Sequence, residues 1–131
     1  MDESELIKLA KKALQNSYSP YSNFKVGAAL LCSDGSVYLG CNVENSSFGA
    51  VNCAERTAIF SAVADGKKEF KMLAVVGSSD GRCDSFTPPC GICRQVMSEF
   101  CCTDFKVIMT NGKEIKSLTI KELLPFPFDS F

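Results

Sequence analysis

Histidine is missing from this 131-residue chain, and its absence removes several kinds of active site at once. Without imidazole there is no histidine-containing catalytic triad, no histidine ligand for zinc and no histidine general base. Acid/base chemistry near neutral pH must therefore come from a carboxylate or from water bound to a metal ion.

Strong positive charge is also missing. The formal net charge is -1, the sequence pI is about 5.4, and no basic cluster is longer than Lys67-Lys68. Proteins that bind nucleic acid usually carry a basic surface, because neutralising phosphates supplies most of their non-specific affinity. The sequence therefore predicts a small uncharged ligand and no nucleic-acid partner.

Long apolar runs and a basic leader are absent as well. No apolar stretch approaches the ~20 residues that span a bilayer. The first residues, Met1-Asp2-Glu3, are acidic where a secretory signal would be basic. We therefore expect no membrane association and a cytoplasmic location. The eight cysteines are then expected to be reduced, as metal ligands or small buried side chains.

Residues 1–131 are expected to form a single domain, because the chain is long enough for one core and contains no linker or repeat. Hydrophobic periodicity and turn residues predict the order helix, two strands, helix, strand, helix, two strands and a short helix. The ranges are 2–16, 24–32, 36–42, 53–64, 71–77, 90–100, 105–110, 114–118 and 119–124. This order predicts an α/β fold, specifically a three-layer α/β/α sandwich with a five-stranded mixed sheet.

Three cysteines have the spacing of a metal site. Cys90 and Cys93 stand three residues apart at a predicted helix start, and Cys53 stands at the start of another helix. Three thiolates leave one position of tetrahedral Zn²⁺ open for water, as in catalytic zinc sites, whereas structural sites are normally closed by four ligands. Glu55 is the carboxylate beside this open position, a combination that favours hydrolysis.

Glu55 can reach that position only if Cys53 lies at the very tip of its helix. Two residues apart on a regular helix, the side chains would point about 200° away from each other. At the tip, the Cys53 side chain can lie along the helix axis, where the positive end of the helix dipole lowers its thiol pKa. Arg56, one turn further on, is then predicted to donate hydrogen bonds to the sulfur atoms.

Two other interpretations of the cysteines stay open. A structural zinc site would need a fourth ligand, for which Cys83 is the nearby candidate. The spacing of Cys90 and Cys93 also occurs in thioredoxin-like redox proteins, but that interpretation leaves Cys53 and Glu55 without a role. Five cysteines fit no ligand spacing and are expected to be structural: Cys32, Cys41, Cys83, Cys101 and Cys102.

These motifs resemble those of the zinc-dependent deaminases, which combine a Cys/His-x-Glu element with Pro-Cys-x-x-Cys. Four segments extend the resemblance to the small homotetrameric cytidine deaminases across nearly the whole chain. They are residues 24–29, 40–45, 53–58 and 90–95.

The resemblance implies hydrolysis of free cytidine and deoxycytidine to uridine and deoxyuridine with release of ammonia, a reaction of pyrimidine salvage. It implies Zn²⁺ bound by Cys53, Cys90 and Cys93. Glu55 would take a proton from the attacking water, protonate N3 of the base and then protonate the departing ammonia.

Further residues are assigned to the substrate by the same resemblance. Phe24 would pack on the base, and the backbone of Ala54 would help to orient it. Asn42 and Glu44 would hold the 3′-hydroxyl of the ribose, and analogues without that hydroxyl would be rejected because Glu44 would be left unpaired.

The family also implies a homotetramer with shared active sites. An aromatic residue near the C-terminus would enter a neighbouring subunit's site, and the distance from Pro125 favours Phe128 over Phe126. The family usually has tyrosine where Phe48 stands, so this substrate contact lacks a hydroxyl here.

Two related activities are alternatives to the deamination of free cytidine. A nucleic-acid editing deaminase needs a longer crossover to a parallel last strand, whereas the tight Asn111-Gly112 turn predicts an antiparallel one. A deaminase of another cytosine nucleoside, such as blasticidin S, would share the zinc motifs but is not expected to keep Glu44.

Overall fold

All 131 residues are described by the computed structural model of the chain. The ten elements, in chain order, are α1 (Glu3–Leu14), β1 (Lys25–Cys32), β2 (Val37–Cys41), the 3-10 helix η1 (Phe48–Ala50), α2 (Ala54–Ala64), β3 (Phe70–Ser78), α3 (Gly91–Phe100), β4 (Lys106–Thr110), β5 (Ile115–Thr119) and α4 (Ile120–Leu123). None of the helices is both long and apolar enough to cross a membrane.

The five strands form one mixed sheet in the order β2-β1-β3-β4-β5. Strand β1 pairs antiparallel with β2 and β3, β3 runs parallel to β4, and β4 is antiparallel to β5. The predicted mixed sheet and antiparallel last strand are therefore confirmed. Gly35 and Gly112 lie in the two hairpin turns with φ values of 91° and 90°, a left-handed conformation that favours glycine.

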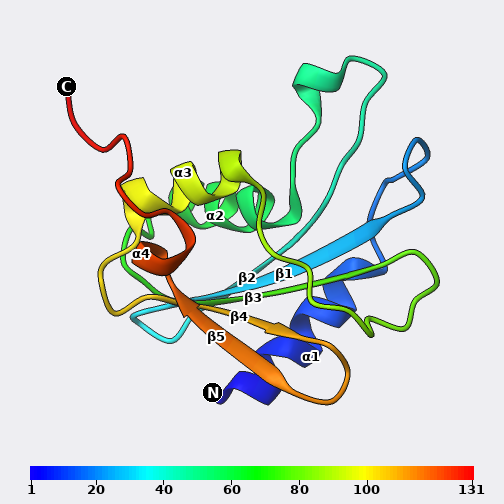
Figure 1. Cartoon of the computed structure of the whole chain (residues 1–131), viewed down its shortest axis with the longest axis horizontal. Helices are drawn as coiled ribbons and strands as arrows, with labels where there is room; N and C mark the ends of the chain where they lie inside the picture. Colours follow the sequence, from blue (N-terminus) through cyan, green and yellow to red (C-terminus); the bar gives the residue numbers. More distant parts are fainter.

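Helices cover both faces of the sheet, so the predicted three-layer sandwich is confirmed. Helix α1 lies on one face, while α2 and α3 lie side by side on the other (Figure 1). Alternate residues of β1 serve the two layers: Leu30 packs in the α2 and α3 core, and Leu31 packs in the α1 core. This two-sided burial explains why β1 and β3 are nearly continuous apolar runs.

The observed helix ends differ slightly from the predicted ones. Helix α1 ends at Leu14 instead of Asn16, because Asn16 and Ser17 donate to the carbonyls of Ala13 and Leu14 in tighter turns. Asp2 caps its start by accepting a hydrogen bond from Glu5 N at 2.8 Å. Helices α2 and α3 each begin one residue after a cysteine.

Helix α2 lies unusually close to strand β2. Ala54, Ala58 and Ala62, four residues apart, are fully buried along one side of the helix. The facing strand has Gly40, and a Cβ atom there would lie 2.5 Å from Ala58 N and would also meet the carbonyl of Ala54. The short distance between α2 and β2 therefore depends on Gly40 in the strand and on the three alanines in the helix. The same close packing positions the start of α2.

Candidate metal centre and active site

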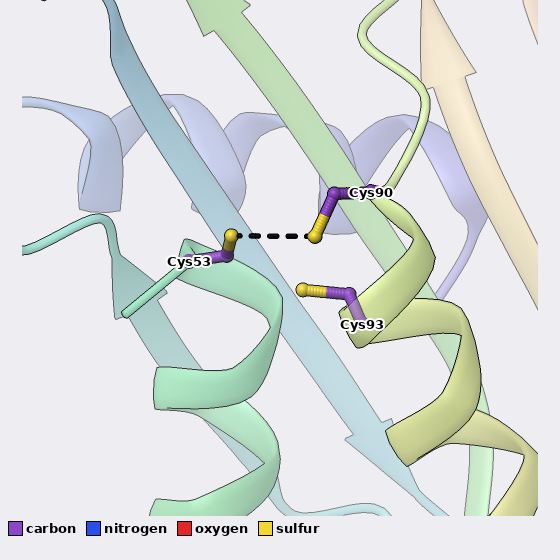
Figure 2. A group of neighbouring side chains, drawn as sticks. All are labelled: Cys53, Cys90 and Cys93. Carbon is purple, nitrogen blue, oxygen red and sulfur yellow. Dashed lines mark hydrogen bonds between the residues drawn. The ribbon is translucent and has the colours of Figure 1, made fainter. Parts of the chain in front are cut away.

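Three cysteine sulfur atoms meet where helices α2 and α3 begin. Figure 2 shows Cys53 from the start of α2 pointing toward Cys90 and Cys93 from the start of α3. All three sulfurs lie within 4.8 Å of one another, and those of Cys53 and Cys90 are 3.6 Å apart. Tetrahedral zinc with Zn–S bonds of about 2.3 Å would separate two sulfurs by roughly 3.8 Å, so this donor set fits Zn²⁺.

The local backbone explains how the cluster forms. Cys53 and Cys90 are N-caps with extended dihedral angles, φ -75° and ψ 157° for Cys53 and φ -70° and ψ 168° for Cys90. Each thiol therefore lies at a helix tip, as the sequence predicted for Cys53. Cys93, in the first turn of α3, is fully buried and completes the cluster from below.

One thiol of the cluster, that of Cys53, favours its charged form, while the hydrogen bond with Cys53 raises the pKa of the Cys93 thiol. The hydrogen bond with the Cys93 thiol, supported by Arg56 and Cys90, lowers the pKa of Cys53 to about 5. Arg56 donates from Nη2 to the sulfur of Cys53 at 3.2 Å, as predicted. One thiolate held between two further sulfur donors is well suited to a soft divalent cation.

Glu55 is buried beside these sulfurs, with only 3% of its surface exposed. Burial, and to a smaller extent the nearby Cys53 thiolate, raises the pKa of Glu55 to about 7. The carboxyl group can therefore both hold and release a proton near neutral pH.

One pocket of about 310 Å³ joins the acid, the sulfurs and the predicted substrate residues. Glu55, Cys53 and Cys90 line one part of it. Its other walls include predicted and unpredicted residues, among them Phe24, Val26, Asn42, Glu44, Thr87 and Pro88. A metal ion bound by the cysteines would therefore lie next to the same pocket as the carboxyl group of Glu55.

The two predicted ribose contacts are held by an internal hydrogen-bond network. Asn42 Oδ1 accepts from Val26 N at 2.9 Å and from the hydroxyl of Ser17, while Nδ2 donates to Phe24 O at 2.9 Å. One N–H of Asn42 remains for a ligand. The same amide thus fixes the backbone on both sides of Lys25 and with it the Phe24 side chain.

Glu44 is oriented by a residue that sequence reasoning missed. Oε1 of Glu44 accepts from Tyr21 N at 2.9 Å and Ser22 N at 3.1 Å, and Oε2 accepts from the Ser22 hydroxyl. These bonds lower the pKa of Glu44, the Ser22 hydroxyl most of all. The only signal in the sequence was the hydroxyl-rich composition of residues 17–23, which is also typical of an ordinary loop.

Three predicted substrate residues do not line this pocket within one chain. The Ala54 side chain is fully buried at the start of α2. Phe48 is 79% exposed and borders a neighbouring hollow that shares Glu44 and Val51 with the pocket. Phe128 is 65% exposed and packs edge-on against Phe131.

The remaining cysteines do not extend the cluster. Cys83 packs in the α1 core, on the opposite face of the sheet from Cys93, so it cannot close the site as a fourth ligand. All eight cysteines are free; Cys32 and Cys83 are buried, whereas Cys102 is exposed. The structural role expected for the other five therefore does not describe Cys102.

Comparison with known families places this geometry in a class. The model of the "Cytidine and deoxycytidylate deaminase zinc-binding region" matches residues 1–109. The match covers most of the chain, including all three clustered cysteines and Glu55. The chain belongs to this family of zinc-binding deaminases.

Within this family, the chain is more similar to proteins named cytidine deaminase than to one named blasticidin-S deaminase. A cytidine deaminase of Sporosarcina psychrophila is 51% identical over 129 residues, covering 98% of this chain and 92% of the relative. The crystal structure of a cytidine deaminase from Burkholderia pseudomallei matches with a TM-score of 0.89 and 48% identity, covering 98% of this chain and 100% of that one. A blasticidin-S deaminase of Bacillus cereus is less similar, at 31% over 128 residues, covering 95% and 90%.

Proposed function

We propose that this protein hydrolyses free cytidine and deoxycytidine to uridine and deoxyuridine, releasing ammonia. The observation that carries the proposal is a cluster of three thiols, two of which, those of Cys53 and Cys90, line the same pocket as a buried carboxyl group. We further propose that residues 1–131 act as one domain, since two clusters of core residues share one continuous sheet.

Cys53, Cys90 and Cys93 would hold the zinc ion beside the pocket that Glu55 lines. Zinc in such a site supplies an activated water at neutral pH and stabilises the negative charge that develops during attack. The helix tips beneath Cys53 and Cys90 help here, because their positive dipole ends offset part of the charge of three thiolates.

Glu55 would move the protons. Its carboxylate accepts a proton from the attacking water as the new C–O bond forms at C4 of the base, and gives that proton to N3. A second proton, also from the water, then passes through Glu55 to the amino group, which leaves as ammonia when the C4–N bond breaks. A carboxyl group with a pKa near neutrality suits both directions of transfer.

The other walls of the pocket would position the nucleoside. The Phe24 ring borders the pocket and offers a flat apolar surface to the base, which the backbone of Ala54 would help to orient. Glu44 and the remaining N–H of Asn42 would bind the ribose 3′-hydroxyl. Phe48, in the adjoining hollow, would contact substrate through its ring alone.

Cytidine is favoured over blasticidin S as the substrate because Glu44 is both present and held in place by three hydrogen bonds. The test is an ultraviolet assay of the zinc-loaded protein with cytidine, deoxycytidine and blasticidin S. We expect turnover of both nucleosides, and no turnover of either would contradict the proposal. Preferential turnover of blasticidin S would favour the alternative.

Removing the Ser22 hydroxyl tests the ribose contact. In Ser22→Ala, Glu44 loses its strongest orienting bond but keeps both backbone donors. We expect kcat/KM for cytidine to fall roughly tenfold through a higher KM, since hydrogen bonds to charged groups are among the stronger ones. Turnover of 3′-deoxycytidine should change little. An equal loss with both substrates would argue against recognition of the 3′-hydroxyl by Glu44.

Arg56 is proposed to retain zinc by drawing charge from the sulfur of Cys53. In Arg56→Gln, we expect zinc to transfer to a coloured chelator about tenfold faster, the lower end of the effect usual for residues that orient metal ligands. Arg56→Lys keeps the charge and should fall between this variant and the wild type. Unchanged zinc transfer and full activity in Arg56→Gln would remove the role.

We also propose a homotetramer in the cytoplasm, acting in pyrimidine salvage. Two features support assembly. Phe48 and Phe128 are largely exposed in the single chain, and Phe128 does not line the pocket of its own chain, so it would contact substrate only in the pocket of a neighbouring subunit. The eight free cysteines support a reducing compartment. Sedimentation of the zinc-loaded protein would test the number of subunits.

A further inference from the structure

Arg94 connects two parts of the chain that are far apart in the sequence. Its Nε donates to the carbonyl oxygen of Pro89 at 2.7 Å, and its Nη1 donates to the carbonyl oxygen of Leu123 at 2.7 Å. Pro89 immediately precedes Cys90, and Leu123 is the last residue of α4. One side chain thus contacts both the loop that leads to Cys90 and the residue immediately before the C-terminal segment, which comprises residues 124–131.

The loop before Cys90 is held by a hydrogen bond from the Arg94 side chain. Pro88 and Pro89 have no amide hydrogen, so this stretch cannot be fixed by donating backbone hydrogen bonds. The Pro89 ring is fully buried, and its carbonyl accepts from Arg94. Arg94 makes no ion pair with a carboxylate, so its two carbonyl contacts are the bonds that orient the guanidinium group.

Gln95 holds the C-terminal segment further along. Its Nε2 donates to the carbonyl oxygen of Phe128 at 2.7 Å. The aromatic side chains of the segment contribute little burial within one chain, since Phe126 and Phe131 are fully exposed and Phe128 is 65% exposed. Hydrogen bonds from α3 therefore hold a segment that apolar packing does not.

We propose that Arg94 and Gln95 are positioning residues that couple zinc retention to the conformation of the C-terminal segment. Both belong to α3, the helix that begins at Cys90 and contains Cys93. A shift of this helix start when zinc leaves would move the donors of both residues. By thermodynamic reciprocity, loosening the segment would also weaken the hold on zinc. This inference rests on the proposed zinc-binding role of Cys90 and Cys93.

Zinc transfer to a chelator tests the first half of the coupling. We expect Arg94→Gln to release zinc about tenfold faster than the wild type, because the Pro89 carbonyl loses its donor. Arg82→Gln is the matched control, since Arg82 is 76% exposed and pairs only with Asp80. It should release zinc at the wild-type rate. Arg94→Lys keeps the charge and one donor and provides a milder variant should Arg94→Gln fail to fold.

Limited proteolysis tests the second half. Prolines follow Leu124 and Phe126, so the Phe128–Asp129 bond is the site in this segment that chymotrypsin can cut. We expect cleavage, followed by mass spectrometry as loss of residues 129–131, to be severalfold faster in Gln95→Ala, in Arg94→Gln and in wild type after zinc removal. Gln95→Ala, which leaves the Pro89 contact intact, should release zinc more slowly than Arg94→Gln.

The proposal is overturned if the folded Arg94 variant releases zinc at the wild-type rate, or if zinc removal leaves cleavage at Phe128 unchanged. Neither readout requires turnover of a substrate. Zinc content of the wild type is measured first: a wild type without zinc contradicts the proposed function itself, whereas a zinc-loaded wild type with no effect in the variants contradicts only the coupling.

Discussion

Glu55→Gln is expected to retain zinc and to lose nearly all turnover of cytidine. The amide keeps the size and hydrogen-bonding capacity of the side chain but cannot take a proton from water or deliver one to N3 and ammonia. General acid/base catalysis contributes roughly 10²- to 10⁴-fold to rate, and we expect a loss at the upper end because Glu55 serves in more than one transfer. The measurement is single-turnover hydrolysis at equal zinc content.

A loss of turnover in Glu55→Gln can be attributed to catalysis, because the substitution is not expected to destabilise the fold. Glu55 is 3% exposed and its raised pKa results mainly from burial, so replacing it with a neutral isostere removes a desolvated charge and should not destabilise the fold. A melting temperature equal to or above that of the wild type is the control. A variant with matched zinc content and undiminished turnover would show that another group moves the protons.

Gly40→Ala is expected to lower the stability of the protein strongly. A Cβ atom at residue 40 would lie 2.5 Å from the backbone nitrogen of Ala58 and would also meet the carbonyl of Ala54. Both atoms belong to the backbone of α2, so no side-chain rotation relieves the contact and the helix must move. We expect a loss of about 3 kcal/mol, the upper end for overpacking, and a melting temperature about 10 °C lower.

The displaced helix carries both Cys53 and Glu55, so the same substitution should also speed zinc loss. Gly49→Ala is the matched stability control, because a Cβ atom at residue 49 meets nothing within 4 Å. Its melting temperature should stay close to that of the wild type. If Gly40→Ala melts at the wild-type temperature, then close packing of α2 on β2 does not determine where the helix begins.

The order of elements was predictable because local signals agreed with the tertiary structure. The two predicted hairpin turns form, with their glycines in the left-handed conformation that tight turns favour, and β3 is buried on both faces as its apolar run predicted. Helix ends were less predictable. The tight turns after Leu14 depend on bonds among a few residues that hydrophobic periodicity does not resolve.

The metal cluster was predictable for a different reason. Spacing alone placed Cys90 and Cys93 at one helix start, and the geometric demand from Glu55 required Cys53 to lie at another. The pocket was only partly predictable. Ser22, Arg94 and Gln95 form hydrogen bonds with partners 22 to 33 residues away along the chain. The neighbouring sequence of a serine in a loop or an arginine in a helix does not indicate such a distant partner.

The most direct test compares zinc content with cytidine turnover in one preparation as a chelator removes the metal. We predict about one zinc ion per chain at the start, turnover that falls in proportion to the zinc removed, and recovery when zinc is returned. A disulfide oxidoreductase would purify without stoichiometric zinc. Turnover that persists in the metal-free protein would contradict the assignment of these three sulfurs and Glu55 to a hydrolytic zinc site.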